Sequence, residues 1–225
     1  MRVRLINKDF VTYGACRALG KAIAAFLMLV SPAWAGPVTV LALGDSLTQG
    51  YGLVEDQGFV PQMQKWIADQ GLEARLVNGG VSGDTTTGGA ARVEWSLTPE
   101  VDAMIVTLGG NDLLRGLDPA MSRGNIEEIL KVAKAKGIEV LLVGMTAPGN
   151  YGAEYKADFD AIYPELSEAY GTLYAGNFFA GLGEGSPADL QAYFQADGIH
   201  PNAEGVARIV EALGPKVVEL ITAAK

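Results

Sequence analysis

The chain contains a single histidine, and the residues around it are of the types that general base catalysis uses. His200 stands in the run Asp197-Gly-Ile-His200-Pro, so a carboxylate precedes it by three positions. On a turn both side chains can face the same way, and the carboxylate can then hold the imidazole in the tautomer that a general base needs. Aspartate and glycine are also common turn residues, so this run taken alone fits an ordinary surface turn better than a catalytic pair.

A serine and two further candidate oxyanion donors stand elsewhere in the sequence. Ser46 follows an apolar run and opens a helical stretch, where a helix N-terminus would favour negative charge on a reacting oxygen. Acyl transfer also needs hydrogen-bond donors aimed at the oxyanion of a tetrahedral intermediate. The N–H groups of Ser46 and Gly83 and the side-chain amide of Asn111 could supply them. Each residue also has a plain structural interpretation, because serine and asparagine cap helices and glycine forms turns.

Short apolar runs alternate with longer segments of helical pattern, and these elements must position the candidate residues. The apolar runs cover residues 38–43, 74–77, 102–108, 138–143 and 172–175, and the helical patterns cover residues 59–70, 86–97, 125–136, 153–170 and 203–224. Apolar strands that alternate with helices predict an α/β fold, a three-layer α/β/α sandwich around a parallel sheet. Ligands of such sheets bind beyond the carboxyl ends of the strands, where the segments containing Ser46, Gly83 and Asn111 begin.

Four sequence blocks carry a resemblance to a known family. They are Gly44-Asp-Ser-Leu47, Ser82-Gly-Asp84, Gly109-Gly-Asn-Asp112 and Asp197-Gly-Ile-His200. In order and spacing they resemble the GDSL lipase/esterase family, also called SGNH hydrolases, over nearly all of residues 38–220. Segments 110–116, 148–152 and 159–164 are similar to the bacterial periplasmic arylesterase, thioesterase and lysophospholipase group. The resemblance implies a flavodoxin-like sheet of five parallel strands.

The resemblance also implies a role for each block. Ser46 would be the nucleophile, His200 the general base and Asp197 the residue that orients His200. The N–H groups of Ser46 and Gly83 and the amide of Asn111 would form the oxyanion hole. The expected substrate is a small ester or thioester with an apolar acyl or aryl group, hydrolysed without a cofactor or a metal ion.

An apolar groove across the top of the sheet is expected to hold the acyl group. We expect the groove to be lined by Leu113, Leu114, Leu117, Pro148 and Tyr151. Ordinary helix packing would explain the leucines equally well.

Two other functions stay open on the sequence alone. A carbohydrate O-deacetylase would use the same catalytic residues and differ only in its groove. A non-catalytic binding protein would keep the scaffold but would not be labelled at Ser46 by an organophosphonate. Because a fold does not by itself imply a function, the site residues must decide between these alternatives.

The first 35 residues predict a secretory signal peptide. Basic residues precede a short apolar run at residues 22–30, and Ala33-Trp-Ala35 provides a site for cleavage after Ala35. The apolar run is about half of the roughly 20 residues that span a bilayer, which favours a cleaved peptide over an anchor. We therefore predict a periplasmic or secreted protein in which residues 36–225 form a single hydrolase domain.

Charge and cysteine content argue against several classes of protein. The full chain has a net charge of -9, and removal of residues 1–35 would leave a charge of -13 and no cysteine. This acidity argues against binding to nucleic acid and against stable membrane insertion after cleavage. One cysteine and one histidine cannot build a disulfide framework and argue against a Cys/His zinc site. The oligomeric state is not determined by the sequence.

Overall fold

The computed structural model describes residues 36–183 and 190–225, and Pro37–Lys225 cluster into one compact unit. The predicted signal peptide, residues 1–35, lies outside the described residues and stays a prediction. Among the described helices, none is both long and apolar enough to cross a membrane.

A five-stranded parallel sheet forms the middle layer, with strand order β2-β1-β3-β4-β5. The strands are β1 (Val38–Gly44), β2 (Ala74–Gly80), β3 (Ala103–Thr107), β4 (Glu139–Val143) and β5 (Leu173–Ala175). Every residue of β1 and β3 is buried, as expected for central strands that are covered on both faces. This strand order is the flavodoxin-like one, and its switch point lies between β1 and β3. The predicted fold class is therefore confirmed.

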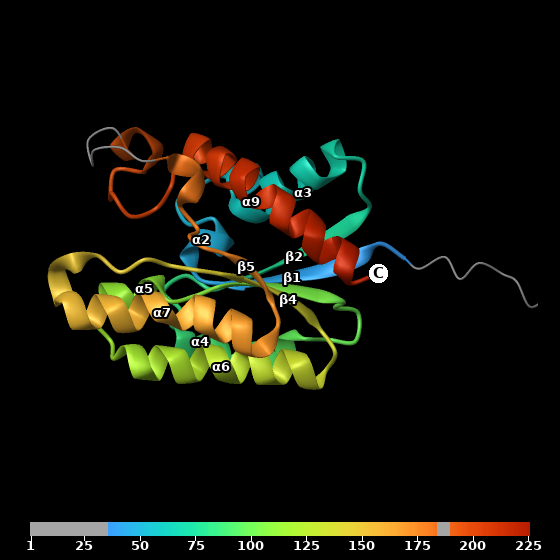
Figure 1. Ribbon diagram of the computed structural model, residues 1–225. Coiled ribbons are helices and arrows are strands. Elements are labelled where there is room, and N and C mark those ends of the chain that lie inside the picture. Colours follow the sequence, from blue (N-terminus) through green and yellow to red (C-terminus); the bar gives the residue numbers. More distant parts are fainter. Residues whose placement is uncertain (1–35, 184–189) are drawn as a thin grey trace, which may run out of the picture. The chain divides into compact units, whose positions relative to one another are not determined.

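Helices cover both faces of the sheet (Figure 1). One layer consists of α3 (Phe59–Asp69) and α9 (Ala203–Ala223), and the other of α4 (Thr86–Ser96), α6 (Pro119–Ala135) and α7 (Ala153–Tyr170). Two short helices, α2 (Ser46–Gln49) and α5 (Gly110–Leu114), follow β1 and β3 directly at the carboxyl edge of the sheet. The segments that contain Ser46 and Asn111 are thus both carried by central strands.

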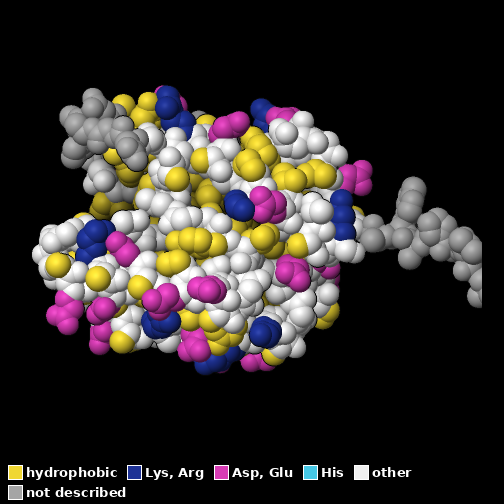
Figure 2. Space-filling model, in the orientation of Figure 1, with side chains coloured by type: hydrophobic (Ala, Val, Ile, Leu, Met, Phe, Trp, Pro, Cys, Tyr) yellow, Lys and Arg dark blue, Asp and Glu magenta, His cyan; other side chains and the backbone are white. Residues whose placement is uncertain are grey.

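Apolar side chains of the sheet and of both helical layers form one hydrophobic core. In α9 the buried residues recur every three or four positions, which is the pattern of a helix that lays one face on a sheet. On the face drawn in Figure 2, hydrophobic side chains form small separate groups, and acidic side chains are frequent over α6 and α7. Ser46 and Asn111 lie at the carboxyl edge of this core, in the short helices α2 and α5.

Strand β2 extends further than its apolar run. The run predicts a strand over residues 74–77, but the strand continues to Gly80, which is paired with Gly44. A side chain at Gly79 would meet Leu41 Cδ1 at 2.8 Å, and one at Gly80 would meet Gln49 Cα at 2.7 Å. Gly79 therefore leaves room for β1, and Gly80 leaves room for the segment after β1, to pack directly on β2.

Helix α6 begins earlier than its apolar periodicity indicates. The periodicity predicts a start at residue 125, whereas the helix starts at Pro119. Asp118 caps it by accepting a hydrogen bond from the N–H of Ala120 at 2.9 Å, and proline suits the first helical position because its missing N–H is not needed there. The first turns carry few large apolar residues, so periodicity alone could not detect them.

Candidate active site

Ser46 stands at the first position of α2, immediately beyond the carboxyl end of β1. Asp45 caps the helix, since its Oδ1 accepts a hydrogen bond from the N–H of Leu47 at 3.0 Å. Gly50 ends the helix in the left-handed conformation, with φ of 89°. A strand that ends in a capped single turn holds the serine at a fixed point on the edge of the sheet, as the sequence predicts.

His200 reaches Ser46 although 154 positions separate them in the chain. The distance between His200 Nε2 and Ser46 Oγ is 2.8 Å, and the distance between His200 Nδ1 and Asp197 Oδ2 is 2.7 Å. The carboxylate of Asp197 also accepts hydrogen bonds from the backbone N–H groups of Ile199 (2.9 Å) and His200 (3.0 Å). The structure thus brings together the three residues that the sequence singles out, in the order carboxylate, imidazole, hydroxyl.

The surroundings of Asp197 keep it ionised. The backbone N–H of His200, the imidazole of His200 and the backbone N–H of Ile199 lower the pKa of Asp197 from 3.8 to about 2. A carboxylate that stays negative can hold the proton of His200 on Nδ1, so that Nε2 is free to accept a proton from Ser46.

Gly83 lies in a tight turn that follows β2. The turn is closed by a 3.0 Å hydrogen bond from the N–H of Asp84 to the carbonyl of Val81. Gly83 has φ of 81°, a left-handed conformation that favours glycine, and its carbonyl accepts a 2.8 Å hydrogen bond from Nη2 of Arg115. The shape of the turn therefore favours glycine at this position. Gly83 is not among the residues that line the pocket beside Ser46.

Asn111 lies in the first turn of α5 and contacts the residue before the serine. Its Nδ2 donates a 3.3 Å hydrogen bond to Oδ2 of Asp45. Asp45 is 1% exposed, and this burial raises its pKa from 3.8 to about 6, against the lowering effect of the hydrogen bonds from Leu47 and Asn111. Asn111 itself lines the pocket beside Ser46.

Two buried polar groups connect the segments around the site, and sequence reasoning did not single out either as a connector. Asp112, fully buried, accepts hydrogen bonds from Thr86 N–H (2.9 Å), Thr86 Oγ1 (2.6 Å) and Ser122 Oγ (3.0 Å). It thereby fastens α5 to the start of α4, just after the Gly83 turn. A single buried aspartate adds nothing to the hydrophobic periodicity of the sequence. Its connecting role is therefore visible only in the structure, from the residues that it contacts.

Arg92 is the second connector. From α4, its Nε binds Asp84 Oδ2 at 2.7 Å, and its Nη1 and Nη2 donate to the carbonyls of Gly79 and Gly44, each at 2.8 Å. The guanidinium therefore joins the ends of β1 and β2 to the turn that holds Gly83.

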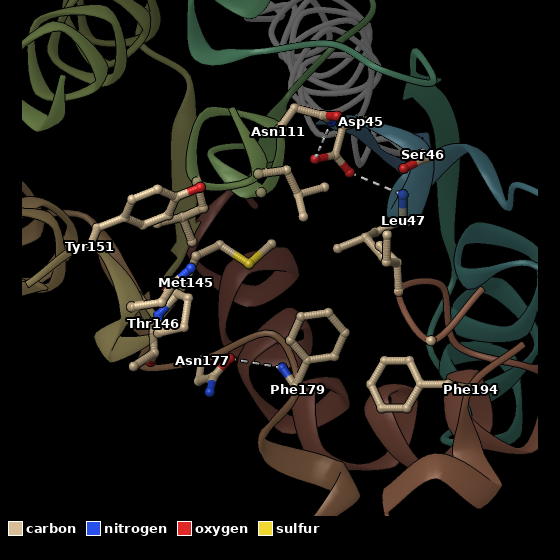
Figure 3. Close-up of a pocket in the computed structure, with 17 residues that line it drawn as sticks. Asp45, Ser46, Leu47, Asn111, Met145, Thr146, Tyr151, Asn177, Phe179 and Phe194 are labelled. Atoms are coloured by element: carbon tan, nitrogen blue, oxygen red, sulfur yellow. Dashed lines mark hydrogen bonds between the residues drawn. The ribbon is translucent and has the colours of Figure 1, made fainter. Parts of the chain in front are cut away.

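An apolar pocket of about 370 Å³ opens beside Ser46 (Figure 3). Met145, Phe179 and Phe194 form much of its far wall, facing Asp45, Ser46 and Asn111 across the hollow. Among the residues expected in an acyl groove, the lining includes Leu113, Leu114, Pro148 and Tyr151. Leu117 is not part of the lining, and its carbonyl accepts a hydrogen bond from the Tyr155 hydroxyl at 3.0 Å. The two phenylalanines were missed, because their segments carry no motif.

Metal ligands are not gathered anywhere in the described ranges: no group of three or more His, Cys, Asp or Glu side chains there could hold a metal ion.

Sequence comparison assigns the family. Residues 42–208, which include Ser46, Gly83, Asn111, Asp197 and His200, match the GDSL-like lipase/acylhydrolase family. The chain belongs to this family. The predicted family is therefore confirmed.

Named relatives of this GDSL-family chain are esterases and thioesterases. It is 39% identical to esterase TesA of Pseudomonas aeruginosa over 184 residues, covering 81% of this chain and 89% of TesA. It is 33% identical to thioesterase 1/protease 1/lysophospholipase L1 of Escherichia coli over 198 residues, covering 87% of this chain and 91% of that protein. The crystal structure of esterase EstA from Pseudoalteromonas, inhibited by monoethylphosphonate, superposes with a TM-score of 0.74 at 26% identity, covering 82% of this chain and 98% of EstA.

Proposed function

We propose that this GDSL-family protein is a serine esterase that hydrolyses carboxylic esters, and thioesters as well, through an acyl-enzyme. The observation that carries the proposal is the continuous path from Asp197 through His200 to Ser46, with hydrogen bonds of 2.7 and 2.8 Å. A hydroxyl bonded to an imidazole, which is in turn bonded to a carboxylate, is the arrangement that activates a serine nucleophile.

The proposed reaction has two steps. Ser46 Oγ attacks the ester carbonyl carbon while Nε2 of His200 takes the hydroxyl proton. His200 then gives this proton to the leaving alcohol or thiol, and the acyl group stays on Ser46. In the second step a water molecule gives a proton to His200, attacks the acyl carbon and releases the acid, and the proton returns to Ser46 Oγ. Throughout, Asp197 stabilises the imidazolium that forms.

Three donors stabilise the oxyanion in this proposal. They are the backbone N–H groups of Ser46 and Gly83 and the Nδ2 amide of Asn111. Asp45 already accepts one N–H of the Asn111 amide, which leaves the second for the substrate. Donors that are held before the substrate arrives need no reorganisation when charge develops, and this is why they accelerate acyl transfer.

The pocket supports an apolar acyl or aryl group in the substrate. Its wall of Met145, Phe179 and Phe194 offers contacts to a hydrocarbon chain and places few charges near it. The names of the relatives, esterase and thioesterase/lysophospholipase, agree with acyl esters and thioesters as the class. The phosphonate-inhibited EstA structure is consistent with a covalently reactive site in that relative.

A substrate panel tests the proposal. p-Nitrophenyl esters of graded acyl length are assayed beside acyl-CoA, a lysophospholipid and acetylated sugars, with wild type and Ser46→Ala compared on each. We expect hydrolysis of medium-chain esters that Ser46→Ala abolishes, together with phosphonate labelling of the wild type. Activity confined to sugar acetates would instead identify a carbohydrate O-deacetylase. No hydrolysis of any of these substrates and no labelling of Ser46 would overturn the proposal and favour a non-catalytic binding protein.

We also propose that the protein acts outside the cytoplasm. The support is the sequence of residues 1–35, with basic residues, a short apolar run and Ala33-Trp-Ala35. Expression of the full chain in a bacterial host, followed by N-terminal sequencing of the exported protein, tests this proposal. The expected first residue is Gly36, and retention of Met1 on cytoplasmic protein would contradict it.

A further inference from the structure

The loop that contains His200 is fastened to the segment after Ser46 by one glutamine. We propose that Gln195 is a positioning residue, which holds the imidazole of His200 at hydrogen-bond distance from the hydroxyl of Ser46. The proposal rests on the proposed function, because it assigns Gln195 a part in the same reaction. Gln195 itself touches neither the reacting atoms nor the apolar pocket.

Gln195 binds its own loop through the backbone. Its N–H donates to the carbonyl of His200 at 2.8 Å, and its carbonyl accepts from the N–H of Gly198 at 3.0 Å. The neighbouring residues Phe194 and Pro201 form an antiparallel bridge, so the two ends of the loop are already paired. The backbone of Gln195 thus sets the shape of the turn on which Asp197 and His200 lie.

The side chain of Gln195 binds across to the nucleophile segment. Its Nε2 donates to the carbonyl of Tyr51 at 2.8 Å and to the carbonyl of Pro201 at 3.0 Å. The N–H of Tyr51 in turn donates to the carbonyl of Ser46 at 3.1 Å. One amide group therefore joins the residue after His200 to the backbone that continues from α2.

Gly52 leaves room for this contact. It has φ of 75°, and a side chain there would overlap Oε1 of Gln195. The amide therefore packs directly on the backbone of Gly52. Beside it, the ring of Tyr51 lies with its centroid 4.6 Å from that of His200, so the same segment also borders the imidazole.

The side chain of Gln195 fixes the position of the His200 turn relative to α2, which Asp197 cannot do. The hydrogen bonds of Asp197 to Ile199 and His200 orient the imidazole within its own turn, and they do not fix the distance to Ser46. The Gln195 amide spans the two segments, so losing it would let the turn shift against α2. A displacement of about 1 Å between catalytic groups can lower a rate by up to about 100-fold.

Two Gln195 variants and a matched control test the proposal. Gln195→Met keeps the length of the side chain without its hydrogen bonds, and Gln195→Glu keeps the shape but replaces the donor by a carboxylate facing two carbonyl oxygens. Gln64→Met is the control, because Gln64 also makes two hydrogen bonds to backbone, to Ala74 O (2.9 Å) and from Leu76 N–H (2.8 Å), between α3 and β2. Each variant is assayed for kcat and KM on a p-nitrophenyl ester, and its folding is checked by circular dichroism and thermal unfolding.

We expect both Gln195 variants to lower kcat about 10- to 100-fold with an unchanged KM, and Gln64→Met to keep the wild-type kcat even where its thermal stability falls equally. The single histidine provides a second readout, because the Nδ1 proton signal in a proton NMR spectrum comes from His200 alone. That signal should shift or broaden in the Gln195 variants and stay in place in Gln64→Met.

Wild-type kcat and an unshifted histidine signal in a folded Gln195 variant would overturn the proposal. If Gln195→Met does not fold, Gln195→Glu decides by the same two measurements. Failure of the proposed function is distinguishable, because it would be seen in the wild type and in Ser46→Ala before any Gln195 variant is compared. The histidine signal does not depend on activity at all.

Discussion

Asn111 donates a 3.3 Å hydrogen bond from its side-chain amide to the carboxylate of Asp45, which is almost fully buried. This contact fixes which side of the amide faces the carboxylate, because only the nitrogen can donate to a carboxylate oxygen. The same carboxylate caps α2 through the N–H of Leu47. One buried acid therefore orients a proposed oxyanion donor and the helix turn of the proposed nucleophile together.

Asp45→Asn should change how stability depends on pH. Burial raises the folded-state pKa of Asp45 from 3.8 to about 6, so between these values the folded protein keeps a proton that the unfolded chain has lost. The free energy of unfolding of the wild type therefore falls as pH rises through this window. Asp45→Asn cannot ionise at this position, so its free energy of unfolding lacks this contribution to the decrease. The difference in unfolding free energy between Asp45→Asn and wild type should therefore change in favour of the variant by on the order of 2 kcal/mol between pH 4 and pH 7.

Urea unfolding at a series of pH values measures this difference directly. Two parallel stability curves for wild type and Asp45→Asn would show that burial of Asp45 does not penalise its charge. The same variant should lower kcat, since an asparagine can turn a donor rather than an acceptor toward Asn111.

Asn111→Ala should reduce turnover strongly and substrate binding little. The amide acts on charge that develops only in the transition state, so its loss should lower kcat about 100- to 1,000-fold with a nearly unchanged KM. Steady-state kinetics on a medium-chain p-nitrophenyl ester measure both constants. A raised KM at wild-type kcat would instead assign Asn111 to ground-state binding.

His200→Ala removes the imidazole of the chain altogether, so no second histidine can substitute for it. We expect kcat to fall by at least about 10⁴-fold, since nucleophile and base act as one unit. The side chain is on a surface loop, and circular dichroism should show a native fold. Full esterase activity in the folded variant would end the assignment of His200 as base.

Leu114→Trp should shift the preference toward shorter acyl groups. Leu114 is 58% exposed and lines the mouth of the pocket, so a larger ring would narrow the space left for a chain. We expect the ratio of kcat/KM for long over short p-nitrophenyl esters to fall about 10-fold. Met121→Trp, on the exposed side of α6 and outside the pocket lining, is the matched control. An equal change of this ratio in both variants would place the acyl group elsewhere.

Arg92→Met should destabilise the fold more than the loss of a surface ion pair. Arg92 is 9% exposed, and its removal leaves the carboxylate of Asp84 and two carbonyl oxygens without their buried partner. We expect a loss of about 3–5 kcal/mol in unfolding free energy by urea titration. Arg123→Met, which breaks an exposed pair with Glu165, should cost less than about 1 kcal/mol. Similar losses in the two variants would contradict a connecting role for Arg92.

The sequence predicts the fold and the main site residues because both follow from local patterns. Buried strands appear as continuous apolar runs, and the blocks with Ser46 and Asn111 each follow such a run directly. The parallel sheet alone places Ser46 and Asn111 at one edge, because the carboxyl ends of parallel strands lie together. The block with His200 follows no strand directly, so its place beside Ser46 was implied by the family resemblance and not by the topology.

The residues that hold the blocks together could not be predicted in this way. Arg92, Asp112 and Gln195 each bind a partner far along the chain, 48, 26 and 144 positions away respectively. A polar residue gives no periodic signal of such partners. Phe179 and Phe194 were missed for a related reason, because the segments around them are irregular.

Helix α9 begins three residues after His200 and runs back across the sheet for 21 residues, about 30 Å. Its end at Ala223 and the start of β1 at Val38 therefore both lie at the amino edge, away from Ser46 (Figure 1). A fusion partner, an affinity tag or a solid support attached at Gly36 or at Lys225 would leave the mouth of the pocket unobstructed, which makes the domain suited to immobilisation.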